Sequence, residues 1–132
     1  RRQRQMCIRD SSATVYEDSH FTVILDVNPA TKGHCLIIPK EHFDNIYDLD
    51  GETAGKLFAL ATCIARAMKD ALKCDGLNLV QNNGEVAGQT VNHFHLHLIP
   101  RYEGDGLNLN WPQQEISGEQ LEEIRQSIKK SI

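Results

Sequence analysis

Two periods of apolar and polar residues run along this chain and divide it into strands and helices. Residues 13–16 and 21–25 are short β-branched and aromatic runs around a polar turn, which is typical of a β-hairpin. Further strand-like runs occupy 34–39, 77–81 and 90–101. Between them lies an apolar stripe at helical spacing, which predicts a long helix over 53–73 and consists of Leu57, Leu60, Ala61, Ile64, Met68, Ala71 and Leu72.

A second amphipathic helix closes the chain. Ser117 with Gln120 three residues later resembles a capping box, and Leu121, Ile124 and Ile128 follow on one helical face. Because strands dominate the first third and one helix precedes the later strands, the pattern predicts an α+β fold with an antiparallel sheet.

The first residues differ from the rest of the chain. Residues 1–5 carry three arginines and no acid, and residues 6–11 resemble the translation of a common sequencing-library adapter. We therefore expect residues 1–12 to be a disordered or non-native tail, and residues 13–132 to form a single domain.

Charge and cysteine usage narrow the class of protein. The net charge is −4, and the three arginines of the tail leave −7 for the remainder, which argues against nucleic acid or an anionic membrane as a partner. A nucleotide held in a small pocket needs no such global field. No apolar run is long enough to span a membrane, and the four scattered cysteines predict reduced thiols in a cytoplasmic protein. Of these, Cys35 and Cys63 are expected in the core.

The candidate chemistry lies in the run 90–101. His93, His95 and His97 alternate with apolar residues at the strand period, which predicts three imidazoles on one face, roughly 7 Å apart, and a core layer on the other. Such a row has three interpretations: satisfied polar residues on an exposed face, a three-histidine zinc site, or nucleophilic catalysis on phosphorus. Zinc-binding histidines usually need carboxylates nearby, and none occurs in sequence between Glu85 and Glu103.

The phosphorus interpretation uses more of the chain. Neutral imidazole attacks without first losing a proton, and crowding lowers the pKa of each ring. The preceding loop, residues 82–89, supplies glycines, backbone N–H groups and amide donors for an anionic phosphate, and Thr90 adds a hydroxyl.

The segment His93-Phe94-His95-Leu96-His97-Leu98-Ile99 resembles the defining motif of the histidine triad (HIT) family, in which three histidines alternate with apolar residues. Matching segments occur in family order over roughly residues 15–101, including Leu25-Asp26-Val27-Asn28-Pro29, Gly33-His34, Asn82-Asn83-Gly84 and Gly88-Gln89-Thr90-Val91. The resemblance implies a five-stranded antiparallel sheet with one long helix packed on it. It also implies nucleotide hydrolases or transferases that work as homodimers.

The resemblance also implies residue roles. His95 is the expected nucleophile, the carbonyl of His93 orients its ring, His97 contacts the phosphate and leaving group, and His34 completes the cluster. The expected phosphate ligands are Asn82, Gln89, Thr90 and the Val91 N–H. Asp26 is expected to bind the ribose hydroxyls, with Ile24 and Val27 on either side of the base, although both also suit a core role.

Branches of the family differ in the leaving group. His97 favours hydrolysis, since transferase relatives have glutamine there. Pro100-Arg101 resembles the dinucleoside-polyphosphate branch, whereas Gly88-Gln89-Thr90 resembles the phosphoramidase loop. We expect hydrolysis of an AMP-like purine nucleotide such as a nucleoside phosphoramidate. Alternatives are a dinucleoside polyphosphate hydrolase and a nucleotide-binding module without turnover.

Some relatives hold a structural zinc ion through an N-terminal Cys-x-x-Cys and two histidines equivalent to His42 and His93. This chain has Cys7 and Asp10 in place of the cysteine pair. We therefore expect no metal and no cofactor.

Overall fold

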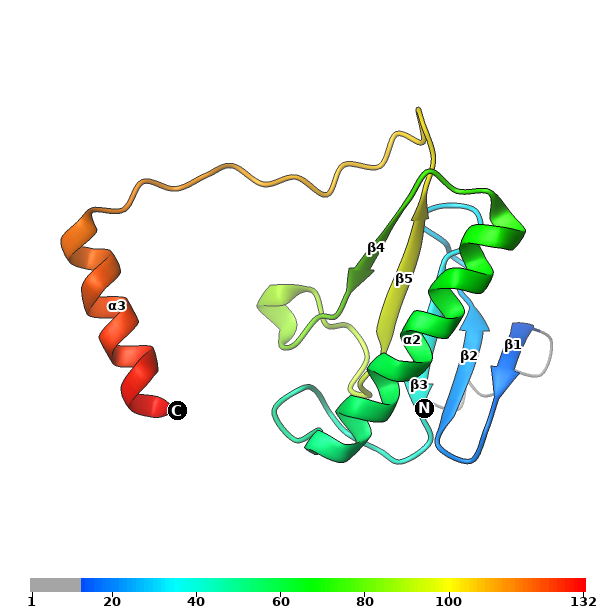
Figure 1. Ribbon diagram of the computed structural model, residues 1–132, viewed down its shortest axis with the longest axis horizontal. Coiled ribbons are helices and arrows are strands. Elements are labelled where there is room, and N and C mark those ends of the chain that lie inside the picture. Colours follow the sequence, from blue (N-terminus) through cyan, green and yellow to red (C-terminus); the bar gives the residue numbers. More distant parts are fainter. Residues whose placement is uncertain (1–12) are drawn as a thin grey trace.

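A five-stranded antiparallel sheet with one long helix across it forms the body of the molecule, in a computed structural model that describes residues 13–132 (Figure 1). The strands are β1 (Thr14–Glu17), β2 (Phe21–Leu25), β3 (Cys35–Pro39), β4 (Gly76–Val80) and β5 (Leu96–Arg101), in the spatial order β1-β2-β3-β5-β4. The helices are α2 (Gly51–Leu72), the short 3-10 helix η1 (Glu85–Ala87) and α3 (Gly118–Ser131). The predicted α+β class, with its five-stranded sheet, long helix and C-terminal helix, is confirmed.

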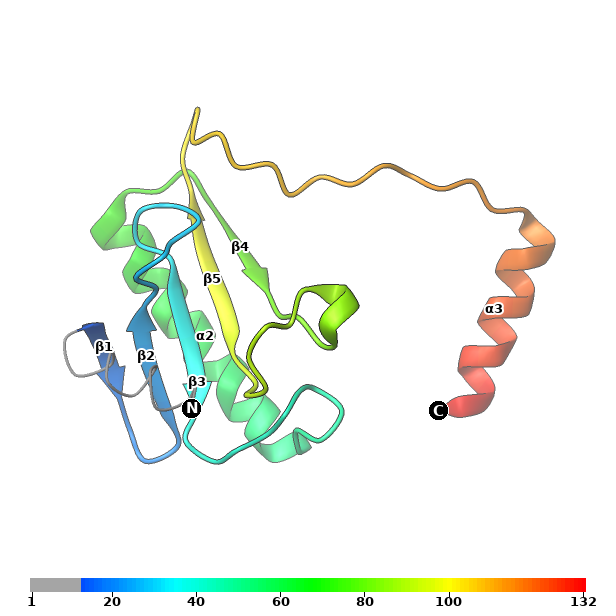
Figure 2. The ribbon, with the colours of Figure 1, turned by 180° about the vertical axis from the view of Figure 1, so that it is seen from behind.

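Helix α2 lies against one face of the sheet, in front of it in Figure 1 and behind it in Figure 2. Its N-terminus is capped by Asp50, whose carboxylate accepts from the Thr53 N–H at 2.9 Å. The predicted stripe packs on side chains from the central strands, except at Ala71, which is exposed. This core includes Leu57, Ala61, Ile64 and Met68 of α2 with Phe21, Val23, Cys35, Ile37, Leu96 and Leu98 of the sheet.

The opposite face of the sheet carries different chemistry. Strand register pairs Leu36 with both Ile24 and His97, so these three side chains share one side of the sheet. Leu96 and Leu98, on either side of His97, belong to the core under α2. The alternation along β5 therefore places His97 on the face away from α2.

Strand β5 is shorter than the predicted 90–101, and two of the three histidines precede it. It begins at Leu96. The Phe94 N–H donates to the Phe43 carbonyl at 2.7 Å, so residues before Leu96 bond to the loop after β3 instead of continuing the sheet. Of the three histidines only His97 lies in β5, so the prediction of three imidazoles in one strand row is wrong for His93 and His95. The apolar side of the motif lies in the core as predicted.

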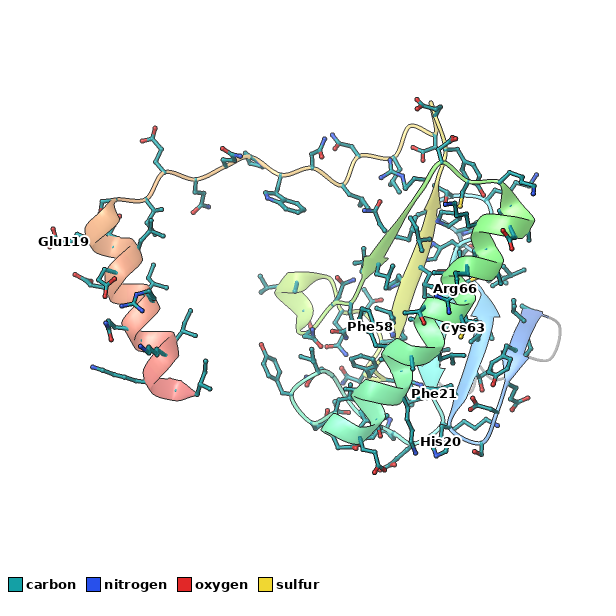
Figure 3. The ribbon with its side chains drawn as sticks, viewed as in Figure 1. His20, Phe21, Phe58, Cys63, Arg66 and Glu119 are labelled. Carbon is teal, nitrogen blue, oxygen red and sulfur yellow. The ribbon has the colours of Figure 1, made fainter. Side chains whose placement is uncertain are left out.

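The C-terminal helix stands clear of the body. Residues after β5 run in an extended arm, and α3, marked by Glu119 in Figure 3, lies apart from the sheet in both ribbon views. Its predicted capping box is present, with Ser117 Oγ accepting from the Gln120 N–H at 3.1 Å.

The cysteines and helices bear on two other predictions. Cys35 is buried, but Cys63 is exposed on α2 beside Arg66 (Figure 3), so its predicted core position is wrong. In residues 13–132, the cysteines Cys35, Cys63 and Cys74 are free, and no helix is both long and apolar enough to cross a membrane. The predicted tail 1–12 lies outside the described residues.

Candidate active site

A chain of hydrogen bonds assigns the protons of His34 and His97. The Ala30 backbone N–H lies 3.0 Å from His34 Nδ1, and a backbone N–H can only donate, so this nitrogen is an acceptor. Neutral His34 then carries its proton on Nε2, which lies 2.9 Å from His97 Nδ1. His97 Nδ1 is therefore an acceptor as well. It follows that neutral His97 has its N–H on Nε2, where it can donate to a ligand.

His95 has the opposite tautomer. Its Nδ1 lies 2.8 Å from the carbonyl oxygen of His93, which can only accept, so Nδ1 carries the proton. The Nε2 atom of neutral His95 consequently holds an available lone pair. The rings of His95 and His97 are in edge contact with centroids 4.9 Å apart. One nucleophilic nitrogen and one N–H donor thus occupy neighbouring rings.

The environment favours neutral rings. Burial lowers the pKa of His97 to about 4, with the nearby His95 and His34 rings acting in the same direction. Burial also lowers the pKa of His34, partly opposed by the carboxylate of Asp26. At neutral pH both side chains are uncharged, as the hydrogen-bond chain requires.

The loop between β2 and β3 positions His34 and Asp26. The Asp26 N–H donates to the His34 carbonyl at 2.9 Å, and Thr31 Oγ1 donates to the Pro100 carbonyl at 2.6 Å. Gly33 has φ +96°, and a Cβ there would lie 2.5 Å from the Leu72 side chain, so only glycine fits. The loop is therefore tied to both β5 and α2, and it places an Asp26 oxygen 3.9 Å from His34 Nε2.

The predicted phosphate-binding loop is held in shape by Gln89. This buried side chain accepts from the Gly84 N–H at 2.8 Å and donates to the Val91 carbonyl at 3.1 Å and the Asp44 carbonyl. Its amide oxygen and nitrogen are therefore already bonded to backbone groups of the protein. By contrast, no described residue bonds to the side-chain amide of Asn82, and Thr90 is exposed. Val91 is partly buried in the same loop.

Ile24 and Val27, the expected base contacts, lie in different surroundings. Ile24 is buried with Leu36 and Ile38, whereas Val27 is 51% exposed. The core role considered for Ile24 is thus present, and Val27 is open to a ligand.

His93 forms a second histidine pair, with His42. His93 Nε2 donates to the Pro39 carbonyl at 2.9 Å, and its Nδ1 lies 2.9 Å from His42 Nδ1. His42 Nε2 lies 2.7 Å from an Asp44 oxygen. Sequence reasoning missed Asp44 and the Ala30 N–H; of the two, only Asp44, two residues after His42, could have been suggested by its closeness in sequence.

Two groups of residues bear on metal binding. Asp26, His34 and His97 bring one ligand atom each within 4.8 Å of one another. However, the Ala30 N–H keeps a proton on His34 Nε2, and a metal there would displace it and break the bond to His97. His42 and His93 fit a metal better, because their Nδ1 atoms converge while Nε2 donates to a carboxylate or carbonyl. Zinc there would be structural and would need further ligands. Cys7 and Asp10 lie outside the described residues, so the expected absence of metal stays a prediction.

Comparison with known proteins gives a consistent picture. A model of the HIT domain matches residues 9–104. Protein hit of Bacillus subtilis is 45% identical over 92% of this chain and 86% of its own length, and adenosine 5'-monophosphoramidase HNT1 of Saccharomyces cerevisiae is 37% identical over 89% and 72%. The crystal structure of a HIT family protein from Bacillus anthracis superposes with a TM-score of 0.85 at 46% identity, covering 91% of this chain and 87% of that chain. With this match over most of its length and its alternating histidines, the chain belongs to the HIT domain family.

Proposed function

We propose that this protein is a nucleotide hydrolase that cleaves the P–N bond of a nucleoside phosphoramidate through a nucleotidyl group carried on His95. The supporting observation is the 2.8 Å bond between His95 Nδ1 and the His93 carbonyl, which leaves Nε2 unprotonated. The name of the yeast relative, a monophosphoramidase, supports the substrate class.

The reaction has two displacements at the α-phosphorus. In the first, the Nε2 lone pair forms a bond to phosphorus, and the P–N electron pair leaves with the amine, which takes a proton from water. The His95 ring becomes cationic, and its Nδ1–H bond to the His93 carbonyl strengthens with that charge. In the second, water attacks phosphorus, the Nε2–P bond breaks, and the water proton is released with AMP.

The α-phosphate oxygens need hydrogen-bond donors that keep their protons during the reaction. His97 Nε2–H, the Asn82 amide, the Thr90 hydroxyl and the Val91 N–H are the proposed donors. The bonds of Gln89 to Gly84 and Val91 support a role in holding this loop, so we propose that Gln89 acts through loop shape.

The nucleoside would lie over the β2–β3 loop. Asp26 accepts from the ribose hydroxyls, and an AMP-like purine packs on Val27, with Ile24 beneath. The Asp26 carboxylate lies near the neutral rings of His34 and His97. The carboxylate suits the ribose hydroxyls of a nucleotide, and the neutral rings suit its anionic phosphate.

A dinucleoside polyphosphate remains the second candidate, on the motif Pro100-Arg101. Here the Arg101 guanidinium donates to Asp105 at 2.8 Å and to Asn78 at 3.0 Å, which weakens the case for a direct phosphate contact. The cytoplasmic location and the homodimer stay predictions.

Trapping the intermediate tests the proposal. The protein is mixed with adenosine phosphoramidate, quenched in denaturant at early times, and weighed intact by mass spectrometry. We expect one AMP adduct, mapped to the peptide of His95, and neither adduct nor turnover in His95→Ala. His20→Ala, an exposed histidine near the β1–β2 turn (Figure 3), is the matched control. Full turnover by His95→Ala, or tight AMP binding without product in the native protein, would contradict the hydrolase.

A further inference from the structure

The residues directly after the histidine motif take no part in the proposed reaction. Arg101 donates to Asp105 and Asn78, so its guanidinium is already bonded within the protein, and Pro100 is fully buried. The chain leaves β5 beside the loop between β2 and β3, the cyan segment next to the yellow end of β5 in both Figure 1 and Figure 2. The segment 100–105 therefore lies where it can act on the nucleoside side of the site.

Two successive residues of the β2–β3 loop are hydrogen-bonded to this segment. Thr31, which is buried, donates from Oγ1 to the Pro100 carbonyl at 2.6 Å. The Tyr102 hydroxyl donates to the Lys32 carbonyl at 2.5 Å, across 70 positions of sequence. Of these two bonds, only the second is made by a side chain outside the loop. Tyr102 can therefore be changed without altering the loop itself.

Tyr102 is held in place by the turn that follows it. Its N–H donates to the Asp105 carboxylate at 2.9 Å, and the Asp105 N–H donates back to the Tyr102 carbonyl at 3.1 Å. Arg101 donates to both oxygens of Asp105, at 2.8 and 3.0 Å. The Leu107 N–H donates to the same carboxylate at 3.0 Å. The tyrosine hydroxyl is thus presented to the loop from a cross-linked turn.

The loop carries Asp26 at its start and His34 at its end. The Asn28 N–H donates to Asp26 Oδ1 at 2.9 Å, while Asp26 Oδ2 faces His34 Nε2 at 3.9 Å. The Asp26 N–H donates to the His34 carbonyl at 2.9 Å, and the His34 N–H donates to the Thr31 carbonyl at 3.2 Å. Because Thr31 precedes Lys32, a displacement of Lys32 passes through these bonds to the Asp26 carboxylate.

From these contacts we infer that the motif Pro100-Arg101-Tyr102 supports the nucleoside side of the site. The Tyr102 hydroxyl, held by the Arg101–Asp105 turn, positions the β2–β3 loop so that Asp26 meets the ribose hydroxyls. Tyr102 is a positioning residue that acts through the loop. The inference rests on the proposed nucleotide site, and it assigns to Pro100-Arg101 a role other than binding a second phosphate.

Recognition of ribose by a hydroxyl-deleted variant tests the inference. Tyr102→Phe removes only the bond to Lys32, and Tyr16→Phe is the matched control, since the Tyr16 hydroxyl donates to Asp18 at 3.0 Å beside the β1–β2 turn. Calorimetry measures the binding of AMP and of its 2′,3′-dideoxy analogue. We expect the native protein and Tyr16→Phe to prefer AMP by about 10-fold or more, because hydrogen bonds to a charged group are strong.

In Tyr102→Phe the dissociation constant of AMP should rise about 3–10-fold, while that of the dideoxy analogue changes less than about 2-fold. With adenosine phosphoramidate, KM should rise by the same factor as the AMP constant. The value of kcat should stay within about 3-fold, because His34 directly precedes β3 and is held by it. An unchanged preference for AMP, or equal losses for the two nucleotides, would overturn the inference.

A second variant tests whether the turn and the hydroxyl act together. Asp105→Asn weakens the turn, so it should reduce the preference for AMP in the same direction as Tyr102→Phe. The double variant should match the larger single effect within about 2-fold, because both changes act through one bond. Effects that multiply would overturn the coupling of the turn to the loop.

Hydrogen exchange provides a readout that needs no nucleotide. Peptides covering residues 26–34 should exchange about 5-fold faster in Tyr102→Phe than in Tyr16→Phe, with α2 unchanged. Equal exchange in the two variants would overturn the positioning role. Native protein that binds AMP with a ribose preference but without turnover would contradict the hydrolase alone. Turnover without any ribose preference would contradict the present inference alone.

Discussion

Two histidine pairs in this protein have the same nitrogen–nitrogen distance. They differ in whether a ring nitrogen remains available to a ligand. His34 and His97 lie 2.9 Å apart, as do His42 and His93. In the second pair each Nε2 atom is directed at a protein oxygen, of Asp44 or Pro39. In the first, the chain from Ala30 leaves His97 Nε2–H without a partner in residues 13–132. The difference teaches that a histidine is available for catalysis when its neighbours fix which nitrogen carries the proton and leave the other nitrogen free to contact a ligand.

Removal of the proposed nucleophile, His95, is expected to have the largest effect on activity. His95→Ala should lower kcat by about 10⁴-fold or more, because no other group supplies the lone pair on Nε2. Steady-state kinetics with adenosine phosphoramidate measures this. A fall of less than about 10-fold in a folded variant would place the nucleophile elsewhere.

Acid should lower the stability of the folded protein through His97. The pKa of His97 is about 4 in the folded protein, against an ordinary value of 6.5 in the unfolded chain. As the pH falls, His97 therefore binds a proton in the unfolded chain before it does so in the folded protein. The contribution to the free energy of unfolding is fully present above pH 6.5 and is lost progressively down to about pH 4, by about 3 kcal/mol.

Urea unfolding across this pH range checks the prediction, with His97→Gln as the comparison. The variant should lose less stability between pH 6.5 and pH 4 than the native protein. A slope unchanged by the substitution would mean that His97 does not titrate as its burial implies.

Much of the scaffold follows from local pattern, and the proton assignments do not. The stripe of α2, the capping box at Ser117 and the core side of β5 are set by periodicity and nearest neighbours, so the sequence predicts them. The His93 ring bonds to Pro39 and His42, which are distant from it in sequence. The Ala30 N–H that sets the tautomer of His34 is a backbone group, so the type of residue at position 30 does not predict it.

The tautomer of His97 can be tested through His34. His34→Gln keeps a polar side chain but removes the ring that joins the Ala30 N–H to His97 Nδ1. With the proton of His97 free to occupy either nitrogen, we expect kcat to fall about 10–100-fold while KM changes less. A positioning role also predicts a changed pH profile of kcat, since Asp26 and His95 remain beside His97 while His34 is gone. A loss confined to KM would assign His34 to binding instead.

The smallest effect is expected at the other pair. His42→Gln should change kcat less than about 3-fold, because His95 is oriented by the backbone carbonyl of His93 and not by its ring. The His42 side chain is 52% exposed and bonded to Asp44, so its loss leaves the Phe94–Phe43 backbone bond in place. The measurement pairs kinetics with elemental analysis and chelator treatment of the native protein. Turnover that survives both the substitution and chelation would separate this pair from the chemistry. A loss of more than about 10-fold would join the two pairs into one functional unit, through the segment before β5 that contains both His93 and His95.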